Sequence, residues 1–240
     1  MRFPPLRPSV FSRFMSSSPT KKVSDVAANA SQLRGSFIVF EGLDRCGKST
    51  QSKMLLDYLN DSKTCEAIPL RFPDRTTTIG KMIDSYLQNK CEADDRSIHL
   101  LFSANRWERD GAMRKDLLAG KTIICDRYSY SGVAFSASKG LELDWCFAPE
   151  KGLLAPDLII YLDISVEEAQ KRGGYGGERY EKTEMQQRVE ANYKKLMKMD
   201  GPEWKVISAA DSVENLHKLI RETAAKTLEM SKDRPLGTIS

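Results

Sequence analysis

"FEGLDRCGKST" (Phe40–Thr50) is the most informative stretch of this 240-residue chain. The stretch satisfies the spacing G-x-x-x-x-G-K-[ST] at Gly42, Gly47, Lys48 and Ser49. Glycines at these positions let the backbone curl so that successive amide groups point inward at phosphate oxygens. An apolar run precedes the stretch and a helical pattern begins near Lys48, which is the context that a phosphate-binding loop requires. The stretch therefore predicts a nucleotide-binding α/β protein.

The side chains of this loop have expected partners on a bound nucleotide. The positive end of the following helix and the charge of Lys48 attract the β- and γ-phosphates, and Ser49 offers its hydroxyl oxygen to Mg²⁺. Asp44 and Arg45 are not needed to hold phosphate through backbone amides, so they indicate a further use of the loop. The expected ATP-binding residues here are Gly42, Asp44, Arg45, Gly47, Lys48, Ser49 and Thr50.

Strand-like and helix-like patterns alternate along the chain from Gly35 onward. The expected strands are the short apolar runs "SFIVFEG", "CEAIPLRF", "KTIICDRY", "PDLIIYLDI" and "WKVISA". Pro69 interrupts the second run and places that strand near an edge. Such alternation predicts a parallel sheet with helices on both faces, in a single domain over residues 31–240. Ligands of such sheets bind at the carboxyl ends of the strands.

The N-terminal residues 1–30 differ from the rest in composition. The first 24 residues hold five of the 37 basic residues and none of the 33 acidic ones, so the net charge of +4 belongs to this segment. The charge of the remaining chain gives no indication of nucleic-acid binding. An Arg- and Ser-rich, acid-free segment predicts a disordered transit peptide for a mitochondrion or plastid, with an untargeted tail as the alternative. Met15 offers a second start that would yield a cytosolic or nuclear form.

Two further features narrow the class of protein. No apolar run approaches the roughly 18 to 20 residues of a membrane span, so we expect no membrane insertion. The five cysteines show no metal-binding spacing and predict reduced thiols in an intracellular protein. Cys46 lies within the phosphate loop, where we expect a variable position, with redox sensitivity as the alternative.

Four fragments combine an arginine with an aromatic residue. They are "RFPDRTT" (71–77), "LLFSANRWE" (100–108), "CDRYSYSGVAF" (125–135) and "RGGYGGERYE" (172–181). A guanidinium group binds phosphate with two hydrogen bonds, and an aromatic face stacks on a base. The phosphate loop alone leaves a kinase, a GTPase-like switch and an assembly ATPase open. "NKCE" (89–92) lacks the aspartate of a guanine-binding motif, and the four fragments favour a kinase with a second phosphate or hydroxyl site.

In this order, the loop and these fragments resemble the thymidylate kinase family, from Gly35 to the C-terminal "RPLG". The resemblance implies phosphorylation of dTMP to dTDP by ATP with Mg²⁺, and a P-loop kinase fold whose five-stranded parallel sheet has the order 2-3-1-4-5. By analogy with the family it also implies a homodimer. A deoxynucleoside kinase and a non-catalytic nucleotide-binding regulator remain as alternatives. Arg75 and Arg127, both expected on the acceptor phosphate, favour a monophosphate acceptor.

The resemblance also implies roles for individual residues. Phe102 would stack on thymine, and Arg106, one helical turn later, would bind the base edge. Asp44 would face the acceptor's sugar, and Arg172 would lie near the adenine of ATP. The implied substrate-binding residues are Asp44, Phe72, Arg75, Phe102, Arg106, Arg127, Gly132, Phe135, Tyr180 and Gln186; the implied catalytic residues are Arg45, Lys48, Asp126 and Arg127.

The implied metal-binding residues are Ser49 and Asp126, although Asp126 could instead cap the following helix. The glycine-rich segment at about residues 172–182 is expected to be a lid over ATP. The chain carries Arg45 in its loop and only Arg179 in the second half of the lid. This distribution resembles the group of the family whose catalytic arginine lies in the phosphate loop.

Overall fold

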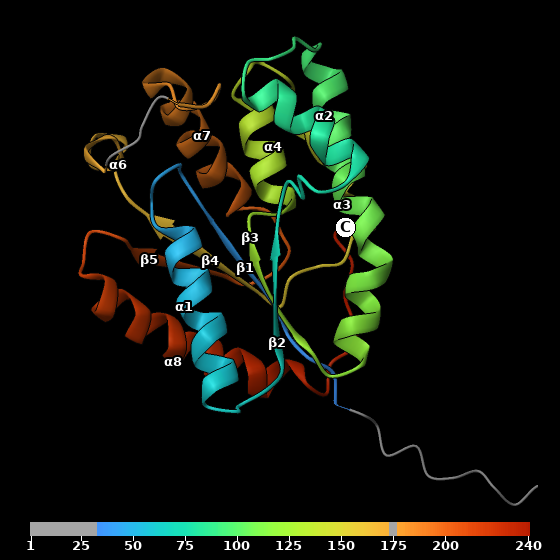
Figure 1. The fold of residues 1–240 in the computed structure, drawn as a ribbon, viewed down its shortest axis with the longest axis vertical. Coiled ribbons are helices and arrows are strands. Elements are labelled where there is room, and N and C mark those ends of the chain that lie inside the picture. Colours follow the sequence, from blue (N-terminus) through green and yellow to red (C-terminus); the bar gives the residue numbers. More distant parts are fainter. Residues whose placement is uncertain (1–32, 173–176) are drawn as a thin grey trace, which may run out of the picture. The chain divides into compact units, whose positions relative to one another are not determined.

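A computed structural model describes residues 33–172 and 177–240 (Figure 1). The expected extension over residues 1–30, the second start at Met15 and the glycine-rich positions 173–176 of the expected lid lie outside the described residues. None of the helices in the described ranges is long and apolar enough to cross a membrane.

The centre of the fold is a parallel sheet of five strands. The strands are β1 (Phe37–Gly42), β2 (Ala67–Arg71), β3 (Thr122–Asp126), β4 (Leu158–Asp163) and β5 (Trp204–Ser208). Their order is β2-β3-β1-β4-β5, which confirms the order that the family resemblance implied and the edge position of the strand with Pro69. Phe40 of β1 lies opposite Asp126 of β3 and Ile160 of β4, so the carboxyl ends of the central strands meet at one edge of the sheet.

Helices cover both faces of the sheet, as the alternating pattern predicted. The helices are α1 (Lys48–Asp61), α2 (Thr78–Leu87), α3 (Asp95–Leu118), α4 (Ser129–Ala137), α5 (Leu143–Phe147), α6 (Val166–Lys171), α7 (Thr183–Leu196) and α8 (Val213–Ser231). A short 3-10 helix, η1 (Ala148–Glu150), follows α5 directly. Helices α1 and α8 pack together on one face of the sheet, whereas α3, α4 and α7 lie on the other (Figure 1).

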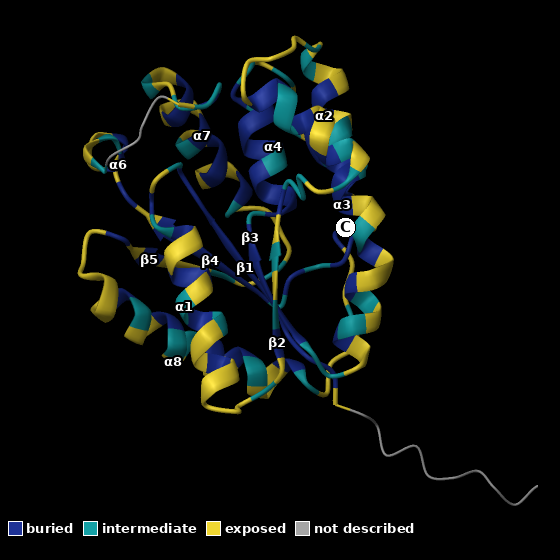
Figure 2. Ribbon diagram, viewed as in Figure 1, coloured by how far each residue is buried: buried dark blue, intermediate teal, exposed yellow. Residues whose placement is uncertain are grey.

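Strand β1 contributes alternate residues to two separate hydrophobic cores. Ile38 and Phe40 pack toward α1 and α8, where they join Leu55 and other buried residues. Phe37 and Val39 point to the opposite face. All four of these strand residues are fully buried, and β1 is dark blue in Figure 2. A strand covered on both faces needs apolar residues at every position, which is why "FIVF" is a continuous apolar run.

Two segments remote in sequence meet behind α3. The amide of Gly152 donates to the carbonyl of Ile239 at 2.8 Å, and the amide of Ile239 donates to the carbonyl of Leu153 at 2.8 Å. Ala155 adds a third bond of this kind to Gly237, at 3.1 Å. The C-terminal segment therefore holds the stretch that follows η1 in place.

Candidate active site

A cavity of about 710 Å³ opens at the carboxyl ends of β1, β2 and β3. Its walls come from the phosphate loop, the residues after β2, helix α3, the turn from β3 into α4 and the segment 178–181. Sixteen of the eighteen residues expected at the site line this cavity: Asp44, Arg45, Gly47, Lys48, Ser49, Thr50, Phe72, Arg75, Phe102, Arg106, Asp126, Arg127, Gly132, Phe135, Arg172 and Tyr180. Gly42 and Gln186 lie one contact behind it, through Arg127 and Asp44 respectively.

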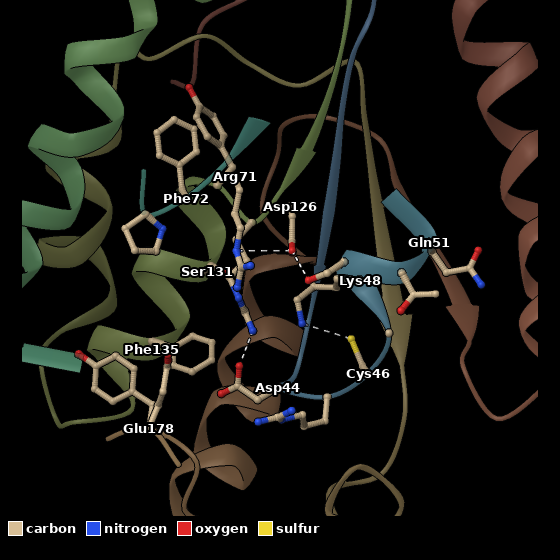
Figure 3. Close-up of a pocket in the computed structure, with 18 of the residues that line it drawn as sticks. Asp44, Cys46, Lys48, Gln51, Arg71, Phe72, Asp126, Ser131, Phe135 and Glu178 are labelled. Carbon is tan, nitrogen blue, oxygen red and sulfur yellow. Dashed lines mark hydrogen bonds and ion pairs between the residues drawn. The ribbon is translucent and has the colours of Figure 1, made fainter. Parts of the chain in front are cut away.

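The phosphate loop joins β1 to α1 with backbone angles that most residues avoid. Gly47, the N-cap of α1, has a φ of 103°, which a residue with a Cβ rarely adopts. Arg45 is held at a φ of 65° in the same loop. Lys48 is buried, and its ammonium group donates to the carbonyl of Leu43 at 2.5 Å and lies 3.4 Å from the sulfur of Cys46 (Figure 3). The loop thus encloses one full positive charge at the start of a helix.

Ser49 and Asp126 form a pair of oxygen donors beside this charge. The Ser49 hydroxyl donates to Oδ2 of Asp126 at 2.5 Å. Oδ1 of Asp126 is buried and has no hydrogen-bond partner among the described residues. The alternative that Asp126 caps a helix is wrong, because α4 begins at Ser129 and has Tyr128 as its N-cap. The free carboxylate oxygen fits a hard cation or a water bound to one.

Arg127 connects the phosphate loop with the turn before α4. Its side chain donates to Oδ1 of Asp44 at 2.5 Å, to the carbonyl of Gly42 at 3.2 Å and to the hydroxyl of Ser131 at 3.1 Å. Its guanidinium carbon lies 5.2 Å from the ring centre of Phe135. Burial is the largest single effect and opposes the charge of this side chain, but Asp44, Tyr193, Asp126 and Glu41 together outweigh it and raise the pKa of Arg127 above its ordinary value. Arg127 also has a left-handed backbone, with a φ of 67°.

Gln186 of α7 fixes the other side of Asp44. Its amide nitrogen donates to Oδ2 of Asp44 at 2.7 Å and to the carbonyl of Tyr180 at 3.0 Å. Its amide oxygen accepts from the backbone nitrogen of Asp44 at 3.1 Å. Asp44 is therefore held by Arg127 on one oxygen and by Gln186 on the other, which places its carboxylate between two walls of the cavity.

Two expected phosphate-binding arginines face carboxylates in this structure. Arg75 pairs with Asp84 at 2.8 Å and with Glu178 at 2.9 Å. Arg45 pairs with Glu181 at 3.0 Å. Glu178 and Glu181 belong to the second half of the expected lid, so acids of this segment lie against the guanidinium groups of two other elements.

Aromatic side chains and the guanidinium group of Arg106 line another part of the cavity. Phe102 is half-buried on α3, and Phe72, Phe135 and Tyr180 lie around the same space, with the rings of Phe135 and Tyr180 5.6 Å apart. Arg106 is 2% exposed and is paired through two hydrogen bonds with Glu150.

Arg172 bridges the phosphate loop and the loop after β5. It donates to the carbonyl of Cys46 at 3.0 Å and to the carbonyl of Ala209 at 2.5 Å. Arg172 thus lines the cavity together with Ala209 and Asp211 of the loop after β5.

Two buried acids of the site were missed by the sequence analysis. Glu41, the residue before Gly42, accepts hydrogen bonds from the amides of Tyr128 and Ser131 at 3.0 and 3.1 Å and from the hydroxyl of Tyr193 at 2.8 Å. The sequence contained a signal for Glu41, because an acidic residue in an otherwise apolar buried strand is unusual and indicates a specific partner. Glu150 gave no such signal, because "APEKG" reads as an ordinary polar turn.

A phosphate loop, a hydroxyl–carboxylate pair and an arginine-rich second half of the same cavity define the class of P-loop nucleotide kinases. A family model described as thymidylate kinase matches residues 40–220. Thymidylate kinases of Arabidopsis thaliana and Homo sapiens are 51% and 44% identical to this chain over 207 residues, covering 86% of it and 77% and 97% of those proteins. A solved thymidylate kinase from Candida albicans has 34% identity and a TM-score of 0.76, covering 86% of this chain and 99% of its own. The chain belongs to the thymidylate kinase family, whose members are ATP-dependent nucleoside monophosphate kinases.

Proposed function

We propose that this chain transfers the γ-phosphate of ATP to dTMP and produces dTDP. The observation that carries the proposal is the ion pair between Asp44 and Arg127, which joins the phosphate loop to the acceptor side of one cavity. Membership of the thymidylate kinase family supports the same reaction. Phosphoryl transfer needs alignment of two anions and neutralisation of their charge, and such a cavity provides both.

The donor side of the cavity would hold ATP. Backbone amides of the loop from Gly42 to Thr50 and the N-terminus of α1 would bind its phosphates, and Lys48 would neutralise the β- and γ-phosphates. In doing so, Lys48 would exchange its present bond to the carbonyl of Leu43 for a phosphate oxygen. Arg172 would lie beside the adenine, since it lines the cavity at the loop after β5.

Ser49 and Asp126 would hold Mg²⁺ together with the triphosphate. Hydroxyl and carboxylate oxygens are the donors that Mg²⁺ prefers, and the unpartnered Oδ1 of Asp126 fits the ion or a water that it carries. Bound there, Mg²⁺ would supply positive charge that offsets part of the negative charge of the phosphates.

The acceptor side would hold dTMP. Arg75 and Arg127 would bind its phosphate, and Phe102 would stack on the thymine ring, with Phe72, Phe135 and Gly132 closing the pocket. Arg106 would bind the base edge. Asp44 would accept from the sugar hydroxyl while Gln186 and Tyr180 support it from α7 and the lid segment.

Charge at the transferred phosphoryl group would be stabilised from both sides. Arg45 would contact it from the loop, Arg127 from the acceptor side and Lys48 from beneath. The backbone of both arginines is held in the left-handed region, which is a strained conformation that clusters at functional sites. The nucleophile is an oxygen of the acceptor phosphate, so no covalent enzyme intermediate is needed.

A coupled assay tests this function against the alternatives. Purified protein would be given ATP and Mg²⁺ with dTMP, dUMP, dCMP or thymidine. We expect dTMP to be phosphorylated fastest. Turnover of thymidine in place of dTMP would establish a deoxynucleoside kinase, and ATP binding without turnover of any acceptor would establish a regulator.

Three finer features complete the proposal. Residues 1–30 would act as a transit peptide for a mitochondrion or plastid, with a cytosolic or nuclear form from Met15, and residues 172–182 would close over ATP. The protein would be a homodimer, and nucleic acid would not be a partner. Fluorescent fusions with and without residues 1–14 test the subcellular localisation. Light scattering on the purified protein tests the oligomeric state.

A further inference from the structure

Glu150 is a fully buried carboxylate at the end of η1. Its Oε2 accepts from Nε of Arg106 at 2.7 Å, and its Oε1 accepts from Nη2 of Arg106 at 2.5 Å. A planar guanidinium that makes two parallel hydrogen bonds to one carboxylate has a single orientation. Since Arg106 lines the acceptor side of the cavity, Glu150 sets the direction in which Arg106 faces that space.

A second contact holds the same guanidinium group from the side of α4. A Cβ atom at Gly132 would lie 2.6 Å from Nη2 of Arg106 and 3.0 Å from both its Nη1 and its Cζ. These separations are too short for a side chain, so the guanidinium packs directly against the backbone at Gly132. Because Gly132 has no side chain, the guanidinium group of Arg106 has room to adopt the orientation that its pairing with Glu150 sets.

Helix α3 also fixes the position of Glu150 itself. The carbonyl of Pro149 accepts from the indole nitrogen of Trp107 at 2.7 Å and from the hydroxyl of Ser103 at 3.1 Å. Ser103, Arg106 and Trp107 lie on the same helix, within two turns of one another. The carboxylate and the arginine that it orients are therefore attached to one rigid element.

The remaining donors of Arg106 have a defined chemical preference. A guanidinium group has five N–H donors and no acceptor, and Glu150 occupies two of the five. A base edge facing the others must present an acceptor. Thymine and uracil carry a carbonyl at C4, whereas cytosine carries an amino donor there.

We infer that Glu150 is a positioning residue, which locks Arg106 as a hydrogen-bond donor and so makes the acceptor site select a 4-carbonyl pyrimidine over cytosine. This inference rests on the proposed function, since it concerns the base of the acceptor nucleotide. Without its carboxylate partner, the guanidinium turns and loses its fixed direction, and the discrimination between the two kinds of base falls.

Kinetics of three variants test the inference. Glu150→Gln keeps the size of the side chain but puts an amide N–H against a donor of Arg106, and Glu150→Asp keeps the charge. The control is Asp110→Asn. Asp110 is a buried acid of α3, the helix that carries Arg106; it pairs with Arg114 at 2.6 Å and accepts from the amide of Leu154 at 2.8 Å. For each variant, kcat and KM are measured with dTMP, dCMP and ATP, together with the midpoint of thermal unfolding.

For Glu150→Gln we expect the KM for dTMP to rise at least about tenfold, with kcat and the KM for ATP changed less than about threefold. The preference for dTMP over dCMP in kcat/KM falls at least about tenfold. Glu150→Asp retains most of this preference, and Asp110→Asn lowers the unfolding midpoint while leaving the preference intact. An unchanged preference in Glu150→Gln, or an equal loss in Asp110→Asn, would overturn the inference.

Calorimetry keeps this test separate from that of the proposed function. Wild-type protein that fails to turn over dTMP contradicts the proposed function. Binding of dTMP and dCMP to wild type and to Glu150→Gln is measured without turnover and reports base selection directly. If Glu150→Gln does not fold, the same two ligands are titrated into Glu150→Asp, where a preference reduced less than about threefold is expected and a complete loss contradicts the role of the carboxylate–guanidinium geometry.

Discussion

Nη2 of Arg127 lies 2.5 Å from Oδ1 of Asp44, and this contact joins two elements that are far apart in the sequence. Asp44 belongs to the loop after β1, and Arg127 follows β3. The two strands are neighbours in the sheet, so their carboxyl ends bring both residues to the same edge. Both residues line the same cavity. Under the proposed function each would therefore face donor and acceptor at once, and a loop whose spacing indicates only ATP would become part of the acceptor site.

Arg45→Ala is expected to lower kcat at least about 100-fold, because the variant lacks the guanidinium group that stabilises negative charge on the transferred phosphoryl group. Steady-state kinetics with saturating ATP and dTMP measures this. Glu181→Gln serves as the control, because it removes the present partner of Arg45 at 3.0 Å and should cost less than about tenfold. A near-normal kcat in Arg45→Ala would remove the catalytic role of this residue.

Phe102→Ala is expected to raise the KM for dTMP by about 10- to 100-fold and to leave the KM for ATP almost unchanged. The loss corresponds to one base–aromatic stack. Leu100→Ala is the matched control, because Leu100 lies on the same helix, is 48% exposed and does not line the cavity. Equal increases for both substrates would show that Phe102 supports the fold rather than the base.

Asp126→Asn is expected to raise the Mg²⁺ concentration for half-maximal activity by about 10- to 100-fold, because a carboxylate beside the ion is neutralised. Titration of Mg²⁺ at fixed ATP checks this. Asp57→Asn, an exposed acid of α1, should behave as wild type. If the Mg²⁺ concentration for half-maximal activity is the same in Asp126→Asn and in the control, the carboxylate of Asp126 does not contribute to Mg²⁺ binding.

Glu41→Gln is expected to lower the free energy of unfolding by about 2–3 kcal/mol, since a charged acceptor of several buried hydrogen bonds is lost. The turn from β3 into α4 loses its support at the amides of Tyr128 and Ser131. Urea denaturation measures the effect. Glu92→Gln, a change at an exposed ion pair, should leave the free energy of unfolding almost unchanged. Equal losses in the two variants would contradict the structural role of Glu41.

The buried thiols are expected to resist alkylation near neutral pH. Burial raises the pKa of Cys146 to about 11, and burial also raises the pKa of Cys125 well above its usual range. Only the thiolate reacts, so the rate at Cys146 should rise about tenfold for each pH unit up to its pKa. Cys91 is exposed and should be labelled first at pH 8. Mass spectrometry of native protein measures the order, and equal rates at Cys91 and Cys146 would contradict it.

The sequence predicted the features that depend on neighbouring residues. The phosphate loop, the strand order implied by the resemblance and the clustering of sixteen site residues in one cavity all agree with the structure. The phosphate loop is set by a local pattern, an apolar run that ends in glycine, whereas the strand order and the roles of most site residues came from the family resemblance. Ser165 and Glu168 also have the spacing of a capping box in the sequence, and in the structure the amide of Glu168 donates to the Ser165 hydroxyl at 3.2 Å.

Contacts between side chains that are far apart in the sequence could not be predicted from local sequence patterns. The fragment "RGGYGGERYE" was selected for its arginines, yet Arg179 pairs with Glu92 outside the cavity and packs 4.1 Å from the ring centre of Tyr86. Of the described residues of this fragment, Arg172, Glu178, Tyr180 and Glu181 line the cavity. Acidic and basic side chains are both polar, so the sequence of a polar segment does not indicate which of them face a cavity. The tertiary structure determines this.

The order of the strands has a consequence for the synthesis of the chain. Strand β1 is made first, but its neighbours in the sheet are β3 and β4, which begin at Thr122 and Leu158. At a translation rate of about 5–20 residues per second, this apolar strand leaves the ribosome with both edges open and waits on the order of ten seconds for β3. An unpaired apolar edge is a template for aggregation. The strand that carries the phosphate loop is therefore exposed to aggregation in the nascent chain until β3 has been made.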